Sequence, residues 1–202
     1  MKLLGTLTSP YVRKVRLMLL EKNIPHTYIT DAPNEANSQV TRVNPLGRIP
    51  ALILDSETCV FDSTVITEYV DTLNDTPILI PRQHALERMH VRRWEALADG
   101  IMDSAVVVRM EGLRPADRQD ASTMATHNAA ITRALDFAAE HLGDNEWCEG
   151  KAITLADLAL TSALVYLELR QPERDWRLPH PGLAAWFARM NSRPSVTTAL
   201  AG

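Results

Sequence analysis

The sequence predicts two consecutive domains, a small α/β domain followed by a domain built of helices alone. Up to about residue 76, short apolar runs of strand length and helical patterns follow the order β-α-β-α-β-β-α, which is typical of an α/β domain. From about residue 83 onward, apolar residues recur at helical spacing in long segments and no strand pattern is visible. We therefore expect a first domain over residues 1–76, a linker over 77–83 and an all-helical domain over 84–202.

Composition and charge exclude several classes of protein. The 202 residues are 46% hydrophobic, enough for a packed core, and the formal net charge of -4 provides no basic field for nucleic acid. The two cysteines, Cys59 and Cys148, form no CxxC motif, so we expect neither a disulfide framework nor a metal site. Neither a signal-peptide pattern nor an apolar run of membrane-spanning length is present, so we expect a cytoplasmic protein that binds no membrane.

The first domain opens with a strand over residues 2–6, a helix after Ser9 and a second strand over residues 26–30. Ser9 is a helix N-cap candidate with Pro10 at the first helical position, and Asn23 and Pro25 end the helix. After a polar loop, QVTRV at residues 39–43 predicts a short helix. The buried stripe expected in the first helix consists of Val12, Val15, Met18 and Leu19.

Three cations lie near the beginning of the first helix, where the helix dipole favours acids. These residues are Arg13, Lys14 and Arg16. They indicate an anionic partner, or they are good helix formers on a solvent-exposed face, and the pattern leaves both interpretations open.

The segment NPLGRIPALILDSETCVFDSTVITEY, residues 44–69, organises the first domain. Pro50 precedes a buried strand over residues 51–54, and a cis Ile49–Pro50 bond would turn the backbone N–H and C=O of Ile49 outward to pair with an extended peptide. A second short strand, residues 59–61, leads to Asp62 and Ser63 at the start of a helix that runs to about residue 74. These two residues cap the helix, or they help its free N–H groups to hold a carboxylate.

The second domain is predicted to contain long helices over residues 84–112 and 116–142, a buried central helix after Thr154, a last helix over 182–192 and a tail over 196–202. Thr154 and Asp157 have the spacing of a capping box, so we interpret Asp157 as structural. Trp186 and Phe187 are expected to pack the last helix against the rest of the domain. The expected inner positions of the two long helices are Met89, Trp94, Leu97, Ile101, Met102, Val106, Met124, Ile131, Leu135 and Phe137.

NPLGRIPAL followed by Asp62 and Ser63 resembles the N-terminal domain of bacterial glutathione S-transferases, and the rest of the chain fits this family from end to end. The resemblance implies a thioredoxin-like N-terminal domain and a helical-bundle C-terminal domain. Ser-Pro-Tyr-Val at residues 9–12 also resembles the Cys-Pro-Tyr-Cys of glutaredoxins with both thiols replaced. Serine forms no mixed disulfide but can donate a hydrogen bond to a thiolate, which favours thiolate stabilisation over thiol–disulfide exchange.

The resemblance assigns roles to individual residues. Ser9 would activate the thiol of glutathione, with Thr8 as the alternative donor. Ile49, before the cis Pro50, would pair with the cysteinyl backbone. The resemblance further implies that Ser63 binds the γ-glutamyl carboxylate, Asp62 the γ-glutamyl ammonium and Arg48 the glycyl carboxylate. Asp99 from the second subunit of a homodimer would complete the glutamyl pocket. The implied electrophile pocket consists of Tyr11, Met102, Val106 and Arg109. Arg109 there would indicate an anionic electrophile.

The resemblance implies conjugation of glutathione, as co-substrate, to a small electrophile without a metal. Peroxide reduction and isomerisation are alternatives on the same site, although the zeta class has a double serine and Trp-Arg-Val-Arg where this chain has one serine and RKVR at residues 13–16. Non-enzymatic relatives that bind RNA polymerase or translation factors are a further alternative. Retention of Ser9, Ile49-Pro50 and Asp62-Ser63 favours an enzyme.

Overall fold

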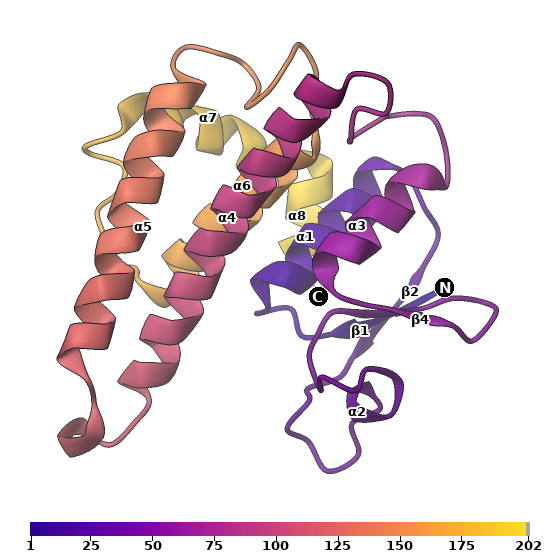
Figure 1. Ribbon diagram of the computed structural model, residues 1–202, viewed down its shortest axis with the longest axis horizontal. Helices are drawn as coiled ribbons and strands as arrows, with labels where there is room; N and C mark the ends of the chain where they lie inside the picture. The colour runs from indigo at the N-terminus through magenta and orange to yellow at the C-terminus, as the bar shows by residue number, and fades with distance from the viewer. Residues whose placement is uncertain (201–202) are drawn as a thin grey trace. The chain divides into compact units, whose positions relative to one another are not determined.

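The computed structural model describes residues 1–200, which form two compact units (Figure 1). The first unit contains residues 1–81 and the segment from residue 192 onward, and the second contains residues 82–191. Within the described part of the chain, every helix is too short or too polar to cross a bilayer.

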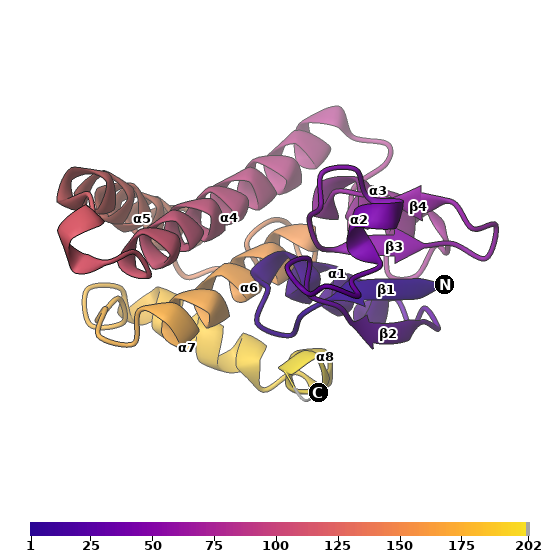
Figure 2. The same cartoon turned by 90° about the horizontal axis from the view of Figure 1, so that it is seen from below.

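A four-stranded mixed sheet forms the centre of the first unit, as expected for a thioredoxin-like domain. Its strands are β1 (Lys2–Gly5), β2 (Thr27–Thr30), β3 (Ala51–Ile53) and β4 (Cys59–Val60). They lie side by side in the order β2-β1-β3-β4, as Figure 2 shows. β1 and β2 are parallel, whereas β3 runs antiparallel to both β1 and β4.

The strand registers bring several chain segments to one edge of the sheet. Gly5 at the end of β1 is opposite Thr30 at the end of β2, Leu4 is opposite Ala51 at the start of β3, and Val60 at the end of β4 is opposite Leu52. The carboxyl ends of β1, β2 and β4 and the amino end of β3 therefore meet. We call this place the common edge.

Helices cover the two faces of this sheet. In Figure 1, α1 (Pro10–Glu21) and α3 (Ser63–Thr72) lie side by side on one face, and the short α2 (Val40–Val43) lies on the other. Leu4, Ala51 and Ile53 alternate with their neighbours along the strands and form a buried cluster with Val40 of α2. The two-residue period of the strands thus divides the apolar side chains between two core layers.

The three cations of α1 are buried, so the interpretation of them as residues of a solvent-exposed face is wrong. An anionic partner stays a prediction. Arg13 is only 4% exposed and donates to the carbonyl oxygen of Leu7 at 3.0 Å. Arg16 donates to the carbonyl oxygen of Ala199 at 2.8 Å and lies over the ring of Tyr28, 4.7 Å from its centroid. Lys14 is fully buried. These three side chains lie in the interior of the first unit instead of on a solvent-exposed surface, because the long apolar stem of each can pack among other side chains.

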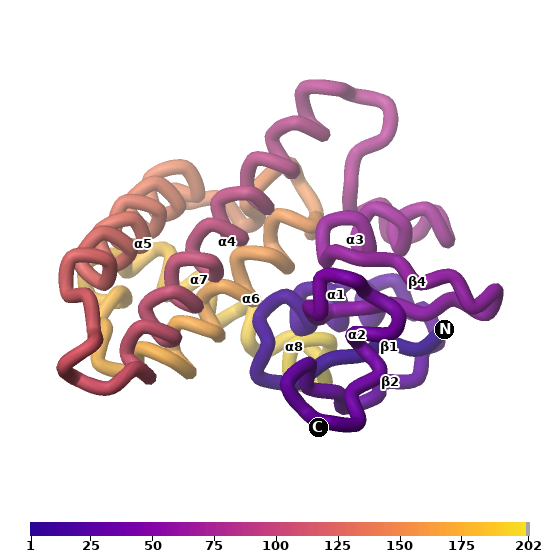
Figure 3. Tube along the Cα trace, turned by 60° about the horizontal axis from the view of Figure 1, so that its bottom comes forward, coloured from indigo at the N-terminus to yellow at the C-terminus, as the bar shows by residue number. Residues whose placement is uncertain are grey.

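The C-terminal segment differs from the expected tail. Residues 194–200 form α8 (Pro194–Leu200), which packs on α1 within the first unit, as Figure 3 shows. Arg193 donates two hydrogen bonds to the carboxylate of Glu21, at 3.0 and 2.8 Å, and the hydroxyl of Ser195 donates to the same group. Proline at the first helical position favours this helix. Residues 201 and 202 of the expected tail lie outside the described residues.

A buried ion pair joins the ends of α1 and α3. The ammonium of Lys22 lies 3.2 Å from Oδ1 of Asp71 and also donates to the carbonyl oxygens of Asn74, at 3.1 Å, and Pro77, at 2.6 Å. Oδ1 of Asp71 accepts a further bond from the backbone N–H of Leu79. Nothing in the sequence pattern indicated this pair, because the partners are far apart along the chain.

The second unit is helical, as the sequence predicts. It consists of α4 (Ala85–Gly112), a 3₁₀ turn η1 (Ala116–Arg118), α5 (Ala121–Leu142), α6 (Leu155–Arg170) and α7 (Pro181–Asn191). α4 packs against both α5 and α6. Residues 155–164 of α6 are all buried, which confirms this helix as the central one.

Two details of the long helices differ from the sequence prediction. The second helix begins at Ala121, not at residue 116, because Asp120 accepts the backbone N–H of Ser122 at 2.9 Å and caps it. Met89, expected inside, is 45% exposed. It lies five residues before the buried Trp94, and at 3.6 residues per turn this spacing places it near the opposite face of α4. Leu97, Val106, Met124 and Phe137 are half-buried.

Asp157 is structural, as expected. Its carboxylate, completely buried, accepts bonds from the backbone N–H of Cys148 at 2.8 Å and from the N–H and hydroxyl of Thr154 at 2.8 and 3.1 Å. Burial raises the pKa of Asp157, and these hydrogen bonds to the carboxylate oppose the rise. The group therefore closes the capping box at the start of α6.

Candidate functional site

Ser9 lies at the beginning of α1, in the turn that leaves the carboxyl end of β1. Its Oγ accepts the backbone N–H of Val12 at a long 3.4 Å, and its extended backbone conformation is that of an N-cap. Among residues 1–200, the hydroxyl hydrogen of Ser9 has no acceptor. The half-buried hydroxyl can therefore donate to a ligand while its oxygen still caps the helix.

Thr8, the alternative donor, is in a different situation. Its side chain is exposed, and its hydroxyl oxygen lies 3.5 Å from that of Thr6. Either hydroxyl of this pair can be the donor. Unlike Ser9, Thr8 is not the N-cap of α1.

The Ile49–Pro50 peptide bond is cis, as the family resemblance implies. Pro50 is buried, Ile49 half-buried and Arg48 exposed. Asn44 holds the preceding turn, since its Nδ2 donates to the carbonyl oxygen of Arg48 at 2.7 Å and its Oδ1 accepts from Leu46 at 3.0 Å. Arg48 and the backbone of Ile49 thus stand immediately before the amino end of β3, at the common edge.

Asp62 and Ser63 occupy the beginning of α3. Oδ1 of the exposed Asp62 caps the helix, accepting the N–H groups of Thr64 at 3.0 Å and Val65 at 3.4 Å. Ser63, the first residue of α3, is only 5% exposed. Asp62 therefore caps α3 through Oδ1. Its other carboxylate oxygen, Oδ2, has no hydrogen-bond partner among residues 1–200. The Phe61–Asp62 peptide bond is also cis.

The common edge brings these three segments together. Ser9 follows the carboxyl end of β1, Ile49 precedes the amino end of β3, and Ser63 follows the carboxyl end of β4. Two helices, α1 and α3, begin there, so two sets of free N–H groups and two positive dipole ends lie at one edge. This arrangement suits a small ligand that carries carboxylate and thiolate charges and an extended backbone.

Five further predicted site residues are Tyr11, the second residue of α1, and four residues of α4. Tyr11 is half-buried in the first unit, and the other four lie on α4 of the second unit. Spacing of four and three residues places Met102, Val106 and Arg109 on one face of α4. Met102 is buried, Val106 is half-buried and Arg109 is exposed, while the half-buried Asp99 has contacts within the chain. Their roles stay predictions.

Sequence reasoning missed two residues near the common edge. Asn44 has no role in the sequence analysis beyond being the first residue of the segment 44–69, and Asp31 lies in the expected polar loop. Asp31 is 5% exposed, and its Oδ2 accepts the N–H of Gln39 ahead of α2 at 2.9 Å. A buried polar residue in a loop gives no periodic signal. Residues 1–200 contain no group of three or more His, Cys, Asp or Glu side chains placed to hold a metal ion.

Comparison with known proteins identifies the family. Residues 8–73 match the N-terminal domain of glutathione S-transferases, and residues 101–194 match the C-terminal domain. The chain belongs to the glutathione S-transferase family. The first match contains Ser9, Ile49-Pro50 and Asp62-Ser63, so these residues of the common edge lie inside the matched N-terminal domain.

Similar proteins span nearly the whole chain. A glutathione S-transferase from Methylobacillus flagellatus KT, solved with GSH bound, is 40% identical with a TM-score of 0.95, over 98% of both chains. One from Methylobacterium radiotolerans JCM 2831, in complex with glutathione sulfonate, is 35% identical with a TM-score of 0.94, over 98% of this chain and 93% of that one. The uncharacterized GST-like protein YibF of Escherichia coli (strain K12) is 38% identical over 96% of each chain.

Proposed function

We propose that this glutathione S-transferase family member binds glutathione at the common edge and transfers it, as the thiolate, to a small electrophile. The observation that carries the proposal is Ser9, whose hydroxyl hydrogen has no acceptor among residues 1–200 and which stands at the start of α1. Glutathione bound to two similar proteins, one as GSH and one as its sulfonate, supports the choice of ligand.

Binding uses the backbone and two helix starts. The N–H and C=O of Ile49, before the cis proline, pair with the cysteinyl backbone of the tripeptide. Ser63 and the first N–H groups of α3 hold the γ-glutamyl carboxylate, and Oδ2 of Asp62 accepts from the γ-glutamyl ammonium. The exposed Arg48 pairs with the glycyl carboxylate. Asp99 of a second subunit completes the glutamyl pocket in a homodimer.

Thiolate formation needs no general base within the site. A free thiol has a pKa near 8.5, and lowering it to about 6.5 requires roughly 2.7 kcal/mol of preference for the anion. One hydrogen bond to a charged acceptor contributes about 1.5–3 kcal/mol. The α1 dipole adds about 0.3–1 kcal/mol. The hydrogen bond from the Ser9 hydroxyl and the α1 dipole can therefore together supply a stabilisation of the thiolate of about this size.

The thiolate sulfur then attacks an electrophilic carbon. A C–S bond forms, and the leaving group departs with the bonding electrons. In the second unit, the α4 face with Met102, Val106 and Arg109 is proposed to receive this second substrate. The guanidinium of Arg109 favours an electrophile that carries an anionic group.

A Ser9→Ala variant tests the proposal. Without the hydroxyl donor, we expect kcat/KM for a model aryl halide to fall roughly 10- to 100-fold. The ultraviolet absorbance of bound thiolate should shift to higher pH, since the anion loses its hydrogen bond. Titrating that absorbance and the rate from pH 5 to 9 measures both effects.

Thr8→Ala is the matched control, because it removes a neighbouring hydroxyl from the same turn. It should leave the thiolate titration unchanged. If Thr8→Ala abolishes the thiolate signal and Ser9→Ala does not, Ser9 is not the activating residue. A wild-type protein that flows through a glutathione column would instead support an interaction protein, and peroxide turnover without aryl conjugation would support a peroxidase.

A further inference from the structure

Asn44 closes the turn that leads into the cis proline. It follows α2, and its side chain is only 2% exposed. The amide is used at both ends, with Nδ2 donating to the carbonyl oxygen of Arg48 at 2.7 Å and Oδ1 accepting from the N–H of Leu46 at 3.0 Å. Its backbone carbonyl also accepts from Gly47 at 2.9 Å. Asn44 thus forms hydrogen bonds with three later residues of the turn, which are Leu46, Gly47 and Arg48.

The turn has a conformation that needs such support. Gly47 has a φ of +59°, a left-handed value that residues other than glycine rarely adopt. Pro45, Leu46 and Arg48 are exposed, so little apolar burial holds these residues in place. The direction in which Arg48 and Ile49 leave the turn therefore depends on hydrogen bonds, and the shortest one in the turn joins Asn44 to the Arg48 carbonyl.

We propose that Asn44 is a positioning residue for glutathione, acting through the Arg48 carbonyl to orient the backbone of Ile49 and the side chain of Arg48. This inference rests on the proposed function, since it assumes that the tripeptide lies at the common edge. Asn44 itself is buried and both ends of its amide are occupied, so it contacts no ligand. Its effect falls on the affinity for glutathione and leaves activation of the thiol by Ser9 unchanged.

The test uses an Asn44→Asp variant, which has the same shape. Oδ1 still accepts from Leu46, but a carboxylate oxygen replaces Nδ2 and faces the Arg48 carbonyl oxygen, so this contact becomes repulsive. We expect the Kd of glutathione, measured by calorimetry, to rise at least about tenfold. The pH dependence of bound-thiolate absorbance at saturating glutathione should match wild type. Asn44→Ser, which keeps a short acceptor for Leu46 but does not reach Arg48, serves if the aspartate variant fails to fold.

Asp31→Ala is the matched control, because it also removes a buried polar side chain beside α2, and the hydrogen bond that it removes goes to Gln39 and not to the turn. Its Kd should stay within about twofold of wild type. An equal loss of affinity in Asp31→Ala would show a general loosening of α2 and overturn the role of Asn44. Affinity within twofold of wild type in Asn44→Asp or Asn44→Ser, or a shifted thiolate titration, would also overturn it.

A double-mutant cycle separates this inference from the proposed function. If Asn44 acts through the turn, its effect on Kd should be smaller in an Arg48→Ala background than in wild type, because part of the contact it positions is already absent. Additive losses would contradict the inference. If the wild-type protein does not bind glutathione, the proposed function fails and this inference fails with it; if it binds and Asn44→Asp binds equally, only this inference fails.

Discussion

At the residue scale, Lys22 shows how a charge is held inside the first unit. All three ammonium protons have oxygen acceptors, on Asp71, Asn74 and Pro77. Such saturation offsets the large cost of removing an ammonium from water. The pair anchors the end of α1 to the end of α3.

Removing only one partner should be costly. Asp71→Leu leaves the Lys22 ammonium buried without its counter-charge, and we expect the free energy of unfolding to fall by about 3–5 kcal/mol. Urea denaturation followed by circular dichroism measures this loss. The double variant Lys22→Met with Asp71→Leu should recover a large part of it, because no buried charge remains. A double variant as unstable as the single one would indicate that packing, and not charge, controls this site.

Ser9 and Asn44 show a second residue-scale rule. Both are small polar residues at helix ends, yet Ser9 uses only its oxygen within the chain, whereas Asn44 uses both the nitrogen and the oxygen of its amide. An uncommitted hydroxyl donor at a helix N-terminus is available to a ligand, whereas an amide bonded through both atoms shapes the backbone. We therefore propose that Ser9 contacts the ligand, whereas Asn44 orients the backbone at the same edge.

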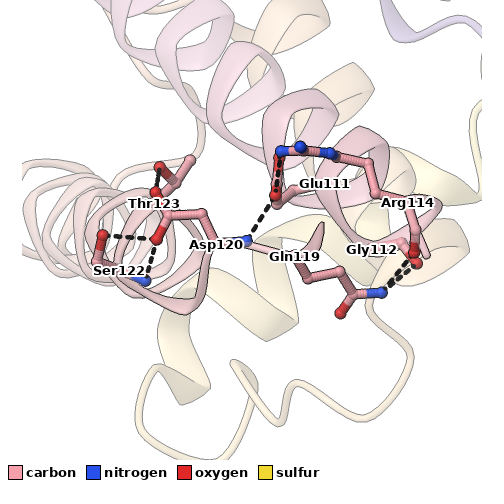
Figure 4. Close-up of polar contacts among 7 residues, drawn as sticks. All are labelled: Glu111, Gly112, Arg114, Gln119, Asp120, Ser122 and Thr123. Atoms are coloured by element: carbon pink, nitrogen blue, oxygen red, sulfur yellow. Dashed lines mark hydrogen bonds and ion pairs between the residues drawn. The ribbon is translucent and has the colours of Figure 1, made fainter. Parts of the chain in front are cut away.

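At the element scale, the α4–α5 connection shows how short-range hydrogen bonds define a helix start. Figure 4 shows Asp120 receiving bonds from Ser122 and Thr123, while its own backbone N–H donates to Glu111 at 2.6 Å. Glu111 also accepts two bonds from Arg114, and Gln119 donates to the carbonyl oxygens of Gly112 and Arg114. The hydrogen bonds from Ser122 and Thr123 lower the pKa of Asp120 from 3.8 to about 2.

This lowered pKa has a definite consequence for stability. Since the folded state favours the ionised Asp120, its stabilising effect is fully present above the unfolded pKa of 3.8 and is lost as pH falls toward 2. Asp120→Asn retains a capping oxygen without a titrating group. We expect the difference in Tm between wild type and Asp120→Asn to change between pH 5 and 2 and to be constant above pH 5. A constant difference over the whole range would contradict the ionised cap.

At the scale of the whole molecule, the first unit is assembled from two distant parts of the chain. α8 returns after the helical unit and packs on α1, with Glu21 bonded to Arg193 and Ser195 at one end and Arg16 bonded to the Ala199 carbonyl at the other. Val196 and Ala199 are buried there. The fold of the first unit is thus complete only once the C-terminal segment is present.

Truncation after Asn191 should therefore destabilise the first unit. Losing the burial of Val196 and Ala199 should cost roughly 2–4 kcal/mol. Amide hydrogen exchange should become faster in β1 and α1. The four tryptophans, at positions 94, 147, 176 and 186, all belong to the second unit, so their fluorescence reports that unit separately. Unchanged exchange in α1 would mean that α8 adds nothing to the first unit.

The sequence by itself determined the order of elements, the change from α/β to all-helical architecture and most of the segments of the common edge. Those features depend on local rules: the periods of strand and helix, Ser9 before Pro10, Gly47 ahead of Pro50, and Asp62 at a helix start. Resemblance to a family supplied the proposed ligand and the proposed roles of the residues. The length of the second long helix was overestimated, because the Asp120 cap signal was not recognised within a polar segment.

Only the tertiary structure decided which polar residues are buried and what they bind. Arg13, Lys14 and Arg16 are indistinguishable from surface residues in the sequence, and the pairs Lys22–Asp71 and Glu21–Arg193 join positions far apart along the chain. The C-terminal helix likewise belongs to the first unit through side chains that are distant from it in sequence. Periodicity reports one element at a time, whereas burial and pairing depend on how separate elements meet in space.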